Sequence, residues 1–306
     1  MLNFVKNRFW FFVLSVILLV VAIVALITFG LNLGIEFKSG STMTIHFEQT
    51  VDQGRLRTEL ADLGYQDAII QRTGDGDYFI HTVELTPEQK EILITNITTN
   101  LETQVQVLDF SSVSPIIAGE IWRNVTIAIG LSAIGMLLYI AWAFRKMPKP
   151  FRWSVCAIVA LLHDLLITAG VFAILGKISN VEIDSMFIIA ILTILGYSIN
   201  NTIVVFDRIR ENMGKVTHAS FGTVVNNSII GTLGRQLNTS LTTIFIVIAL
   251  LVFGGTTIHT FVLVLLVGFI SGLYSSLLVS GQLLVTWETG SLRDTTQDTP
   301  RLQTIP

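Results

Sequence analysis

Six long apolar segments constrain the fold of this 306-residue chain more than any other feature. A hydrocarbon layer about 30 Å thick is crossed by roughly 20 predominantly apolar helical residues. Only 13% of the residues are charged, whereas about a quarter are charged in a typical soluble domain. The sequence therefore predicts a polytopic α-helical membrane protein with six transmembrane helices. The predicted helices occupy residues 9–31, 122–144, 152–176, 184–206, 231–254 and 259–287.

Basic residues in short connections predict the orientation of these helices. They concentrate in the connection "RKMPKPFR" after the second segment, and again after the fourth segment at Arg208, Arg210 and Lys215. Short basic loops stay in the cytoplasm. Both termini are therefore expected in the cytoplasm and residues 32–121 outside. The first segment is too long for the apolar part of a signal peptide and no small-residue cleavage site follows it, so we interpret it as an uncleaved anchor.

Residues 32–121 have the pattern of a separate domain. Met43, Ile45 and Phe47 alternate as in a strand, and residues 51–64 predict a short helix. Residues 67–83 predict two strands around a Gly-Asp turn. Thr86 as N-cap and Gln89 three residues later form a capping box that begins a second helix, and a final strand follows. The order strand, helix, strand, strand, helix, strand predicts an extracytoplasmic α+β ferredoxin-like domain between the first and second transmembrane helices.

The chain is thus expected to have four parts. They are an N-terminal cytoplasmic segment with the first helix at 1–31, the outer domain at 32–121, a five-helix bundle at 122–287 and a cytoplasmic tail at 288–306.

Several function classes lack the residues that they need. The outer domain carries fourteen acidic residues against five basic ones, so it is a poor ligand for anionic lipid surfaces. No basic cluster with interleaved aromatic residues points to nucleic acid. Cys156 has no second cysteine to pair with, and we expect no metal site. The chain has no HExxH, GxSxG or GxxxxGK[ST] motif, and we predict that it is not an enzyme.

Five polar residues in or beside the predicted helices are candidates for function. An ionisable group in a membrane helix is a functional candidate by default, and Asp164 in "ALLHDLLITAG" is such a group, next to His163. Asn200 and Asn201 interrupt the fourth apolar segment, where they either line a hydrated path or bond helices together. Arg235 lies either inside the bundle or at its edge, and Asp207 is expected to form an interfacial pair with Arg208.

Two spacings predict helix contacts. Thr239, Thr242 and Thr243 follow Arg235 on one helical face, which we expect to be buried against other helices. In the sixth helix, small residues at every fourth position would let another helix approach closely, either from this chain or from a partner. This stripe consists of Gly268, Gly272, Ser276 and Ser280.

The string "GYSINNTIVVFDRIREN" resembles the fourth-helix signature of the SecF branch of the SecD/SecF protein-export family, which belongs to the resistance-nodulation-division superfamily. "LGIEFKSGS" is similar to the family's entry to the outer domain, "VSPIIAGEI" to its exit, "LLHDLLIT" to its third helix and "LGRQLNTSLTT" with "LLVFGG" to its fifth. The resemblance implies six helices with one outer domain, and it places Arg235 inside the bundle beside the amides.

The chain departs from the family pattern at three positions. Glu36 stands where the family usually has Asp, and Ser39 where it usually has Gly. Asn201 stands where the family usually has an intramembrane Asp implicated in proton movement, and an amide cannot carry that proton. We therefore expect a partner to supply the carboxylate, with Arg235, Asn200, Asn201 and Asp164 contributing from this chain.

The resemblance implies an accessory subunit of the Sec translocase in the bacterial cytoplasmic (inner) membrane. It would act with a SecD-like membrane subunit beside the SecYEG channel, on an exported unfolded polypeptide, with membrane lipid around it. It would use a transported proton or sodium ion and no cofactor. Two alternatives remain open at this point, a non-conducting scaffold that stabilises the partner and an exporter of small molecules or lipids.

Overall fold

The computed structural model describes residues 3–72, 76–215, 219–290 and 292. The chain forms two compact units, one of residues 1–32 with 128–306 and the other of residues 33–127. We call the first unit the bundle and the second the sheet domain, and we describe each by itself.

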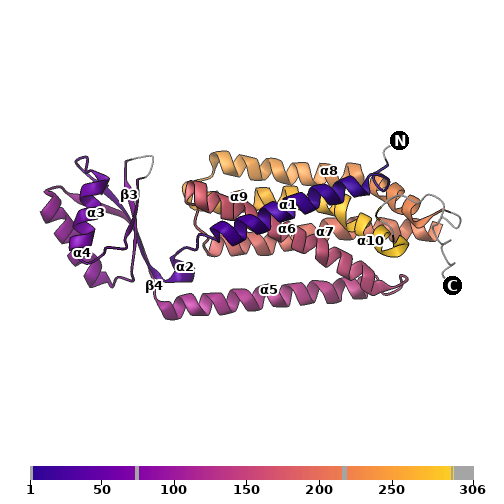
Figure 1. Cartoon of the computed structure of the whole chain (residues 1–306), viewed down its shortest axis with the longest axis horizontal. Helices are drawn as coiled ribbons and strands as arrows, with labels where there is room; N and C mark the ends of the chain where they lie inside the picture. Colours follow the sequence, from indigo (N-terminus) through magenta and orange to yellow (C-terminus); the bar gives the residue numbers. More distant parts are fainter. Residues whose placement is uncertain (1–2, 73–75, 216–218, 291, 293–306) are drawn as a thin grey trace. The chain divides into compact units, whose positions relative to one another are not determined.

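The bundle is built from helices long and apolar enough to cross a membrane. The described residues contain six such helices, which confirms the prediction of a polytopic helical membrane protein. In Figure 1 helices α1, α6, α7, α8 and α9 run alongside one another. The six are α1 (Arg8–Phe29), α5 (Pro115–Ala143), α6 (Pro150–Ser179), α7 (Ser185–Lys215), α8 (Phe221–Phe253) and a last span made of α9 (Thr256–Ser275), a π-helical segment (Ser276–Ser280) and α10 (Gly281–Thr289).

Three of these helices extend beyond the predicted apolar segments. Helix α5 begins at residue 115 instead of 122, α7 continues to residue 215 instead of 206, and α8 begins at residue 221 instead of 231. Hydropathy detects only the apolar part of a helix, whereas a polar part is held by local bonds. At the start of α8, for example, the Ser220 hydroxyl accepts a hydrogen bond from the backbone N–H of Thr223 at 3.3 Å.

Ion pairs one turn apart stabilise the polar end of α7. Arg208 pairs with Glu211 at 2.6 Å, Lys215 pairs with the same carboxylate, and Asp207 pairs with Arg210. The expected pair between Asp207 and Arg208 is therefore wrong, because each of them binds the residue three positions further on, its neighbour on the helix surface.

The bundle has two ends, which we name by what lies there. At the tail end, Glu288 of α10 binds Lys149 at 3.1 Å and Arg152 at 2.6 Å. At the Asn32 end, where α1 ends and α7 begins, the N–H of Ile183 donates to the carbonyl of Asn32 at 2.8 Å. Asp164 is near the middle of α6, between these ends.

The sheet domain has one antiparallel four-stranded sheet in the order β2-β3-β1-β4. Its core includes Met43, Ile45, Leu56, Ile80 and Ile97, each 0% exposed. The predicted Gly-Asp turn involves residues 73–75, which lie outside the described residues. The elements are α2 (Ile35–Lys38), β1 (Gly40–Phe47), α3 (Gln53–Asp62), β2 (Ile69–Arg72), β3 (Tyr78–Thr82), α4 (Pro87–Leu101) and β4 (Val105–Val113).

Helix α4 begins as its sequence predicts. The Thr86 hydroxyl accepts from the N–H of Gln89 at 3.3 Å, and the Gln89 side chain accepts from the N–H of Thr86 at 2.9 Å. This reciprocal pair satisfies two backbone donors that the first turn of a helix cannot satisfy itself.

The chain enters β1 through an unusual backbone turn. Ser39 has φ 63° and ψ 164°, a conformation that non-glycine residues rarely adopt. Gly40 follows with φ 129°, and a Cβ atom there would lie 2.6 Å from the carbonyl oxygen of Thr82. Glycine is required at position 40 by space and conformation, whereas serine at position 39 is strained.

Candidate membrane ion site

Asp164 is the centre of a closed group of hydrogen bonds in the bundle. Its side chain is 0% exposed. Carboxylate oxygen Oδ1 accepts from Ser271 Oγ at 2.7 Å, and Oδ2 accepts from Ser198 Oγ and Ser275 Oγ, both at 2.6 Å. His163 Nδ1 lies 3.1 Å from Oδ1. We call these five residues the Asp164 cluster.

Three helices bring the cluster together. Asp164 comes from α6, Ser198 from α7, and Ser271 and Ser275 are one turn apart on α9. The carboxylate has partners for both oxygens, as a polar group buried in a membrane bundle requires.

Small residues of the predicted stripe allow these helices to approach. A Cβ atom on Gly268 would lie 2.1 Å from Ile194 Cδ1, and one on Gly272 would lie 3.4 Å from Ser198 Cβ. Both neighbours belong to α7 of the same chain. Ser276 and Ser280, the other two members of the stripe, are 0% exposed. The stripe therefore packs inside the bundle. The spacing left open whether the neighbouring helix belongs to this chain or to a partner, and in the structure it is α7 of this chain.

His163 connects the cluster to α1. Its ring stacks on that of Tyr274 with centroids 6.0 Å apart. The Tyr274 hydroxyl in turn contacts Ser15 Oγ at 3.1 Å and donates to the carbonyl of Phe11 at 2.9 Å. Among the described residues, His163 is the titratable side chain that contacts Asp164, and Tyr274 lies behind its ring.

A second polar group lies next to the cluster on its tail-end side. Gln236 of α8 donates through Nε2 to the carbonyl of Asn201 at 2.7 Å, and its Oε1 accepts from Ser276 Oγ at 3.4 Å. Asn201 is 3% exposed, and its Nδ2 has no hydrogen-bond partner among the described residues. Ser276 follows Ser275 directly, so the two polar groups share the last span.

The two amides Asn200 and Asn201 lie on different faces of α7. Asn201 is buried, whereas Asn200 is exposed. The expectation of one polar patch containing both is therefore only half right. The reason is geometric, because consecutive residues of an α-helix point about 100° apart.

Arg235 is exposed, and it has no ion pair with another described residue. Helices of this chain do not bury its face, so burial against other helices stays a prediction that only a partner could fulfil. Its neighbour Gln236 points inward to Asn201, so Arg235 lies near the depth of the amides. We call the exposed polar residues here the Arg235 face. It consists of Arg235, Asn238, Thr239 and Thr242, which share one face of α8.

Sequence reasoning missed three parts of this site. Ser271 and Ser275 were not identified as partners of Asp164, and Gln236 was not identified at all. Polar residues at i and i+4 in an apolar run were the available signal for the two serines. Asp207 is exposed at the polar end of α7, where it pairs with Arg210 and contacts none of these groups.

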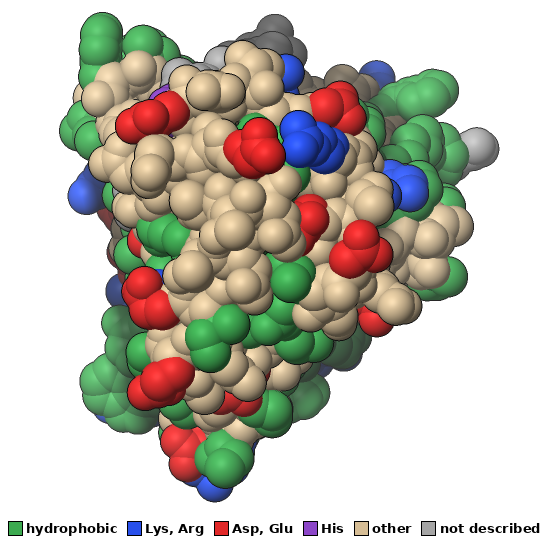
Figure 2. All heavy atoms as spheres, turned by 90° about the vertical axis from the view of Figure 1, so that its left-hand side faces the viewer, with side chains coloured by type: hydrophobic (Ala, Val, Ile, Leu, Met, Phe, Trp, Pro, Cys, Tyr) green, Lys and Arg blue, Asp and Glu red, His purple; other side chains and the backbone are tan. Residues whose placement is uncertain are grey.

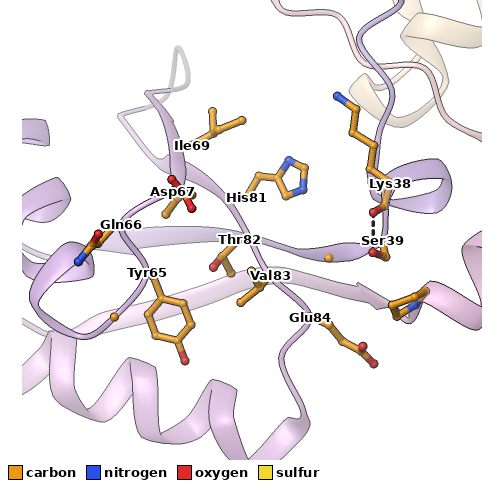
Figure 3. Close-up of a pocket in the computed structure, with 14 residues that line it drawn as sticks. Lys38, Ser39, Tyr65, Gln66, Asp67, Ile69, His81, Thr82, Val83 and Glu84 are labelled. Atoms are coloured by element: carbon orange, nitrogen blue, oxygen red, sulfur yellow. Dashed lines mark hydrogen bonds between the residues drawn. The ribbon is translucent and has the colours of Figure 1, made fainter.

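The sheet domain has a pocket of about 630 Å³. In the view of Figure 3, His81 lies between Lys38 and Asp67. Burial, and then the positive charge of Lys38, lowers the pKa of His81 from its usual value, so its ring is neutral at pH 7. Asp67 and Glu84 also line this pocket. Figure 2 shows acidic side chains scattered over the face of the domain, with fewer basic ones. We find no arrangement for catalysis among the described residues of this pocket.

Comparisons with known proteins agree with the layout of both units. The family described as protein export membrane protein SecD/SecF, C-terminal, matches residues 93–290, and the SecD/SecF GG motif matches residues 24–51. The protein translocase subunit SecF of Thermobaculum terrenum is 43% identical over 299 residues, which are 94% of each chain. SecF of Haemophilus influenzae is 33% identical, over 95% of this chain and 87% of the relative.

Longer relatives contain a region similar to this chain. SecDF of Bacillus subtilis is 33% identical over 95% of this chain and 39% of its own length. The crystal structure of SecDF from Thermus thermophilus, a translocon-associated membrane protein, matches with a TM-score of 0.81 and 33% identity, over 94% of this chain and 38% of the other. With full-length relatives well above 30% identity, the chain belongs to the SecD/SecF family of protein-export membrane proteins.

Proposed function

We propose that this chain is an accessory subunit of the Sec protein translocase, and that it uses a proton gradient to drive late steps of polypeptide export. Family membership supports the process. The Asp164 cluster supports the coupling, because it holds a fully buried carboxylate at the middle of the membrane bundle.

The geometry of the cluster suits a proton carrier. A carboxylate can accept all four contacts, and a protonated carboxyl can donate to a serine hydroxyl, which has free lone pairs. The same side chains therefore serve both protonation states. A sodium ion would have to displace hydroxyls that already bond the carboxylate at 2.6–2.7 Å. One proton crossing 100 mV supplies about 2.3 kcal/mol, which is enough to shift a two-state equilibrium about 50-fold.

We further propose that a SecD-like subunit covers the Arg235 face. An arginine and several amides or hydroxyls are expensive in contact with lipid, so a polar face at this position favours a protein partner. A carboxylate of that partner would be the natural counterion of Arg235. The longer SecDF relatives, in which a region similar to this chain is part of a larger chain, support such pairing.

In this proposal the tail end lies in the cytoplasm. The short connection at the tail end is basic, with Arg145, Lys146, Lys149 and Arg152. The sheet domain then lies outside the bacterial inner membrane, and both termini lie inside. The element order of the sheet domain and its sheet order β2-β3-β1-β4 support a ferredoxin-like assignment. There it would meet the exported polypeptide beside the SecYEG channel.

The test is gradient-driven export into membrane vesicles. Asp164→Asn keeps the size of the side chain. The amide still has an acceptor oxygen and a donor group, as a protonated carboxyl has, but it cannot release or take up a proton. It should reduce export to the rate seen without a gradient, while the complex still assembles. Ser154→Ala is the control, because Ser154 is a buried hydroxyl of the same helix outside the cluster.

Full gradient dependence in Asp164→Asn would contradict proton carriage by this residue. A parent complex whose export does not respond to a gradient would instead favour the scaffold function. Transport of a small molecule or lipid by the purified complex, without export of polypeptide, would favour the exporter function.

A further inference from the structure

The buried polar residues of the bundle are distributed unevenly along its axis. Between Asp164 and the Asn32 end, the buried interior is mainly apolar, and Phe172 and Phe187 meet there edge to face with centroids 5.2 Å apart. The buried polar groups described toward that end are Thr168, whose hydroxyl donates to the carbonyl of Asp164 at 2.8 Å, Ser240, and the hydroxyl of Tyr197. The tail-end half holds many more. They include Asn201, Thr202, Ser228, Thr232, Gln236, Ser276, Ser280 and Gln282.

Gln282 is the residue of this group that most needs an explanation. It is 0% exposed, and neither Nε2 nor Oε1 has a hydrogen-bond partner among the described residues. Thr286 is one turn further on α10, and its buried hydroxyl also lacks a partner there. A fully buried amide cannot reach lipid or another subunit. Water inside the bundle is the ordinary way in which such groups are satisfied.

The π-helical segment lies between these groups and the Asp164 cluster. Ser275 bonds Asp164, Ser276 begins the π segment and bonds Gln236, and Gln282 follows two residues after the segment ends. Short π segments inside α-helices occur frequently at functional sites. The last span therefore carries polar side chains from the carboxylate to the tail end.

We infer that Gln282 and Thr286 hold buried water, and that the proton of Asp164 exchanges with the tail end along the last span. This inference rests on the proposed role of Asp164. The amides themselves carry no proton. The route passes from the cluster through water held beside the unpartnered Asn201 Nδ2 and then through the water at Gln282. Toward the Asn32 end, the described residues offer only the isolated unpartnered hydroxyls of Tyr197 and Ser240 in a mainly apolar interior.

The test follows exchange of the Asp164 proton directly. The full chain in lipid vesicles is moved from H₂O to D₂O, and the infrared carbonyl band of its carboxyl group is recorded over time. Asp164→Asn removes this band and so identifies it. The double variant Gln282→Leu with Thr286→Val should slow exchange about tenfold, which corresponds to about 1.4 kcal/mol in the barrier.

Two variants control for packing. Gln282→Asn keeps an amide and should exchange near the parental rate. Ser240→Ala removes an unpartnered buried hydroxyl from the other half of the bundle and should change nothing. Exchange at the parental rate in the double variant would overturn the inference.

A measurement on the parent chain needs no variant. Hydroxyl-radical footprinting labels side chains next to bound water. Val285, which follows Gln282 by three residues on the same side of α10, should therefore be oxidised faster than Val262 of α9, although both are 0% exposed. Equal protection of the two would overturn the water site.

The outcomes separate the two proposals. Slowed exchange in the double variant, together with full gradient dependence in Asp164→Asn, would leave the route standing and remove the coupling role. Loss of export in Asp164→Asn, with unchanged exchange in the double variant, would support the coupling role of Asp164 and overturn the route.

Discussion

The Asp164 cluster and the Arg235 face satisfy their polar groups in opposite ways. In the cluster, both carboxylate oxygens bond to side chains of the same chain, and none of these is more than 7% exposed. On the Arg235 face, the guanidinium is exposed and has no ion pair among the described residues. One region is therefore complete in this chain, whereas the other has no counterion among the described residues, and we propose that a partner supplies it.

The largest expected effect tests the open region. Arg235→Met should weaken binding of the SecD-like partner by roughly 2 kcal/mol or more, about 30-fold, because it removes a charged anchor at an interface. The stability of the chain alone should not change. Affinity of the purified subunits and thermal unfolding of the chain measure the two quantities.

Lys177→Met is the matched control, since Lys177 is another exposed cation, in the last turn of α6. If Arg235→Met unfolds the chain by itself, or binds the partner normally, the contrast between the two regions is wrong.

The same substitution in both regions sharpens the comparison. Gly272→Leu inserts a side chain where a Cβ atom alone would lie 3.4 Å from Ser198 Cβ and 3.7 Å from Asp164 Oδ2. Such overpacking should lower the stability of the chain by about 1–3 kcal/mol. Gly234→Leu is on the exposed side of α8, with no atom within 4 Å of the added Cβ. It should leave stability unchanged and weaken partner binding.

Denaturation in detergent micelles and partner titration measure both variants. Equal loss of stability in the two would show that the Arg235 face is packed within the chain after all.

The smallest expected effect on stability lies outside both regions, in the backbone turn that leads into β1. Ser39→Gly removes the strain of a positive φ and should stabilise the sheet domain by about 1 kcal/mol, after the added freedom of glycine in the unfolded chain is deducted. Hydrogen exchange of the β1 amides in the full chain measures this change. Gly40→Ala should have the opposite sign, because its Cβ would meet the Thr82 carbonyl. No difference between the two variants would mean that this turn stores no strain.

Local signals in the sequence predicted local structure well. The six apolar segments predicted the helices, and Thr86 with Gln89 predicted the start of α4, since those interactions involve neighbouring residues. The ends of α7 and α8 were misplaced, because ion pairs and caps extend a helix beyond its apolar part.

The candidate site was only partly predictable. Asp164 stood out as a rare charge in an apolar segment, but its serine partners did not, because hydroxyls are common in membrane helices. The periodicity around Arg235 correctly grouped polar residues on one face. It could not show whether that face is covered by the same chain or by another.

The Asp164 cluster also has a consequence for how the chain is made. Ser198 follows Asp164 by 34 residues, and Ser271 and Ser275 follow it by 107 and 111. Helix α6 is therefore synthesised long before most of its hydrogen-bond donors exist. During biogenesis the carboxyl group must enter the bilayer in its neutral form, or α6 must stay beside the insertion machinery until α9 emerges from the ribosome. Assembly of the last helix then completes the site and releases the bundle into the membrane at the same time.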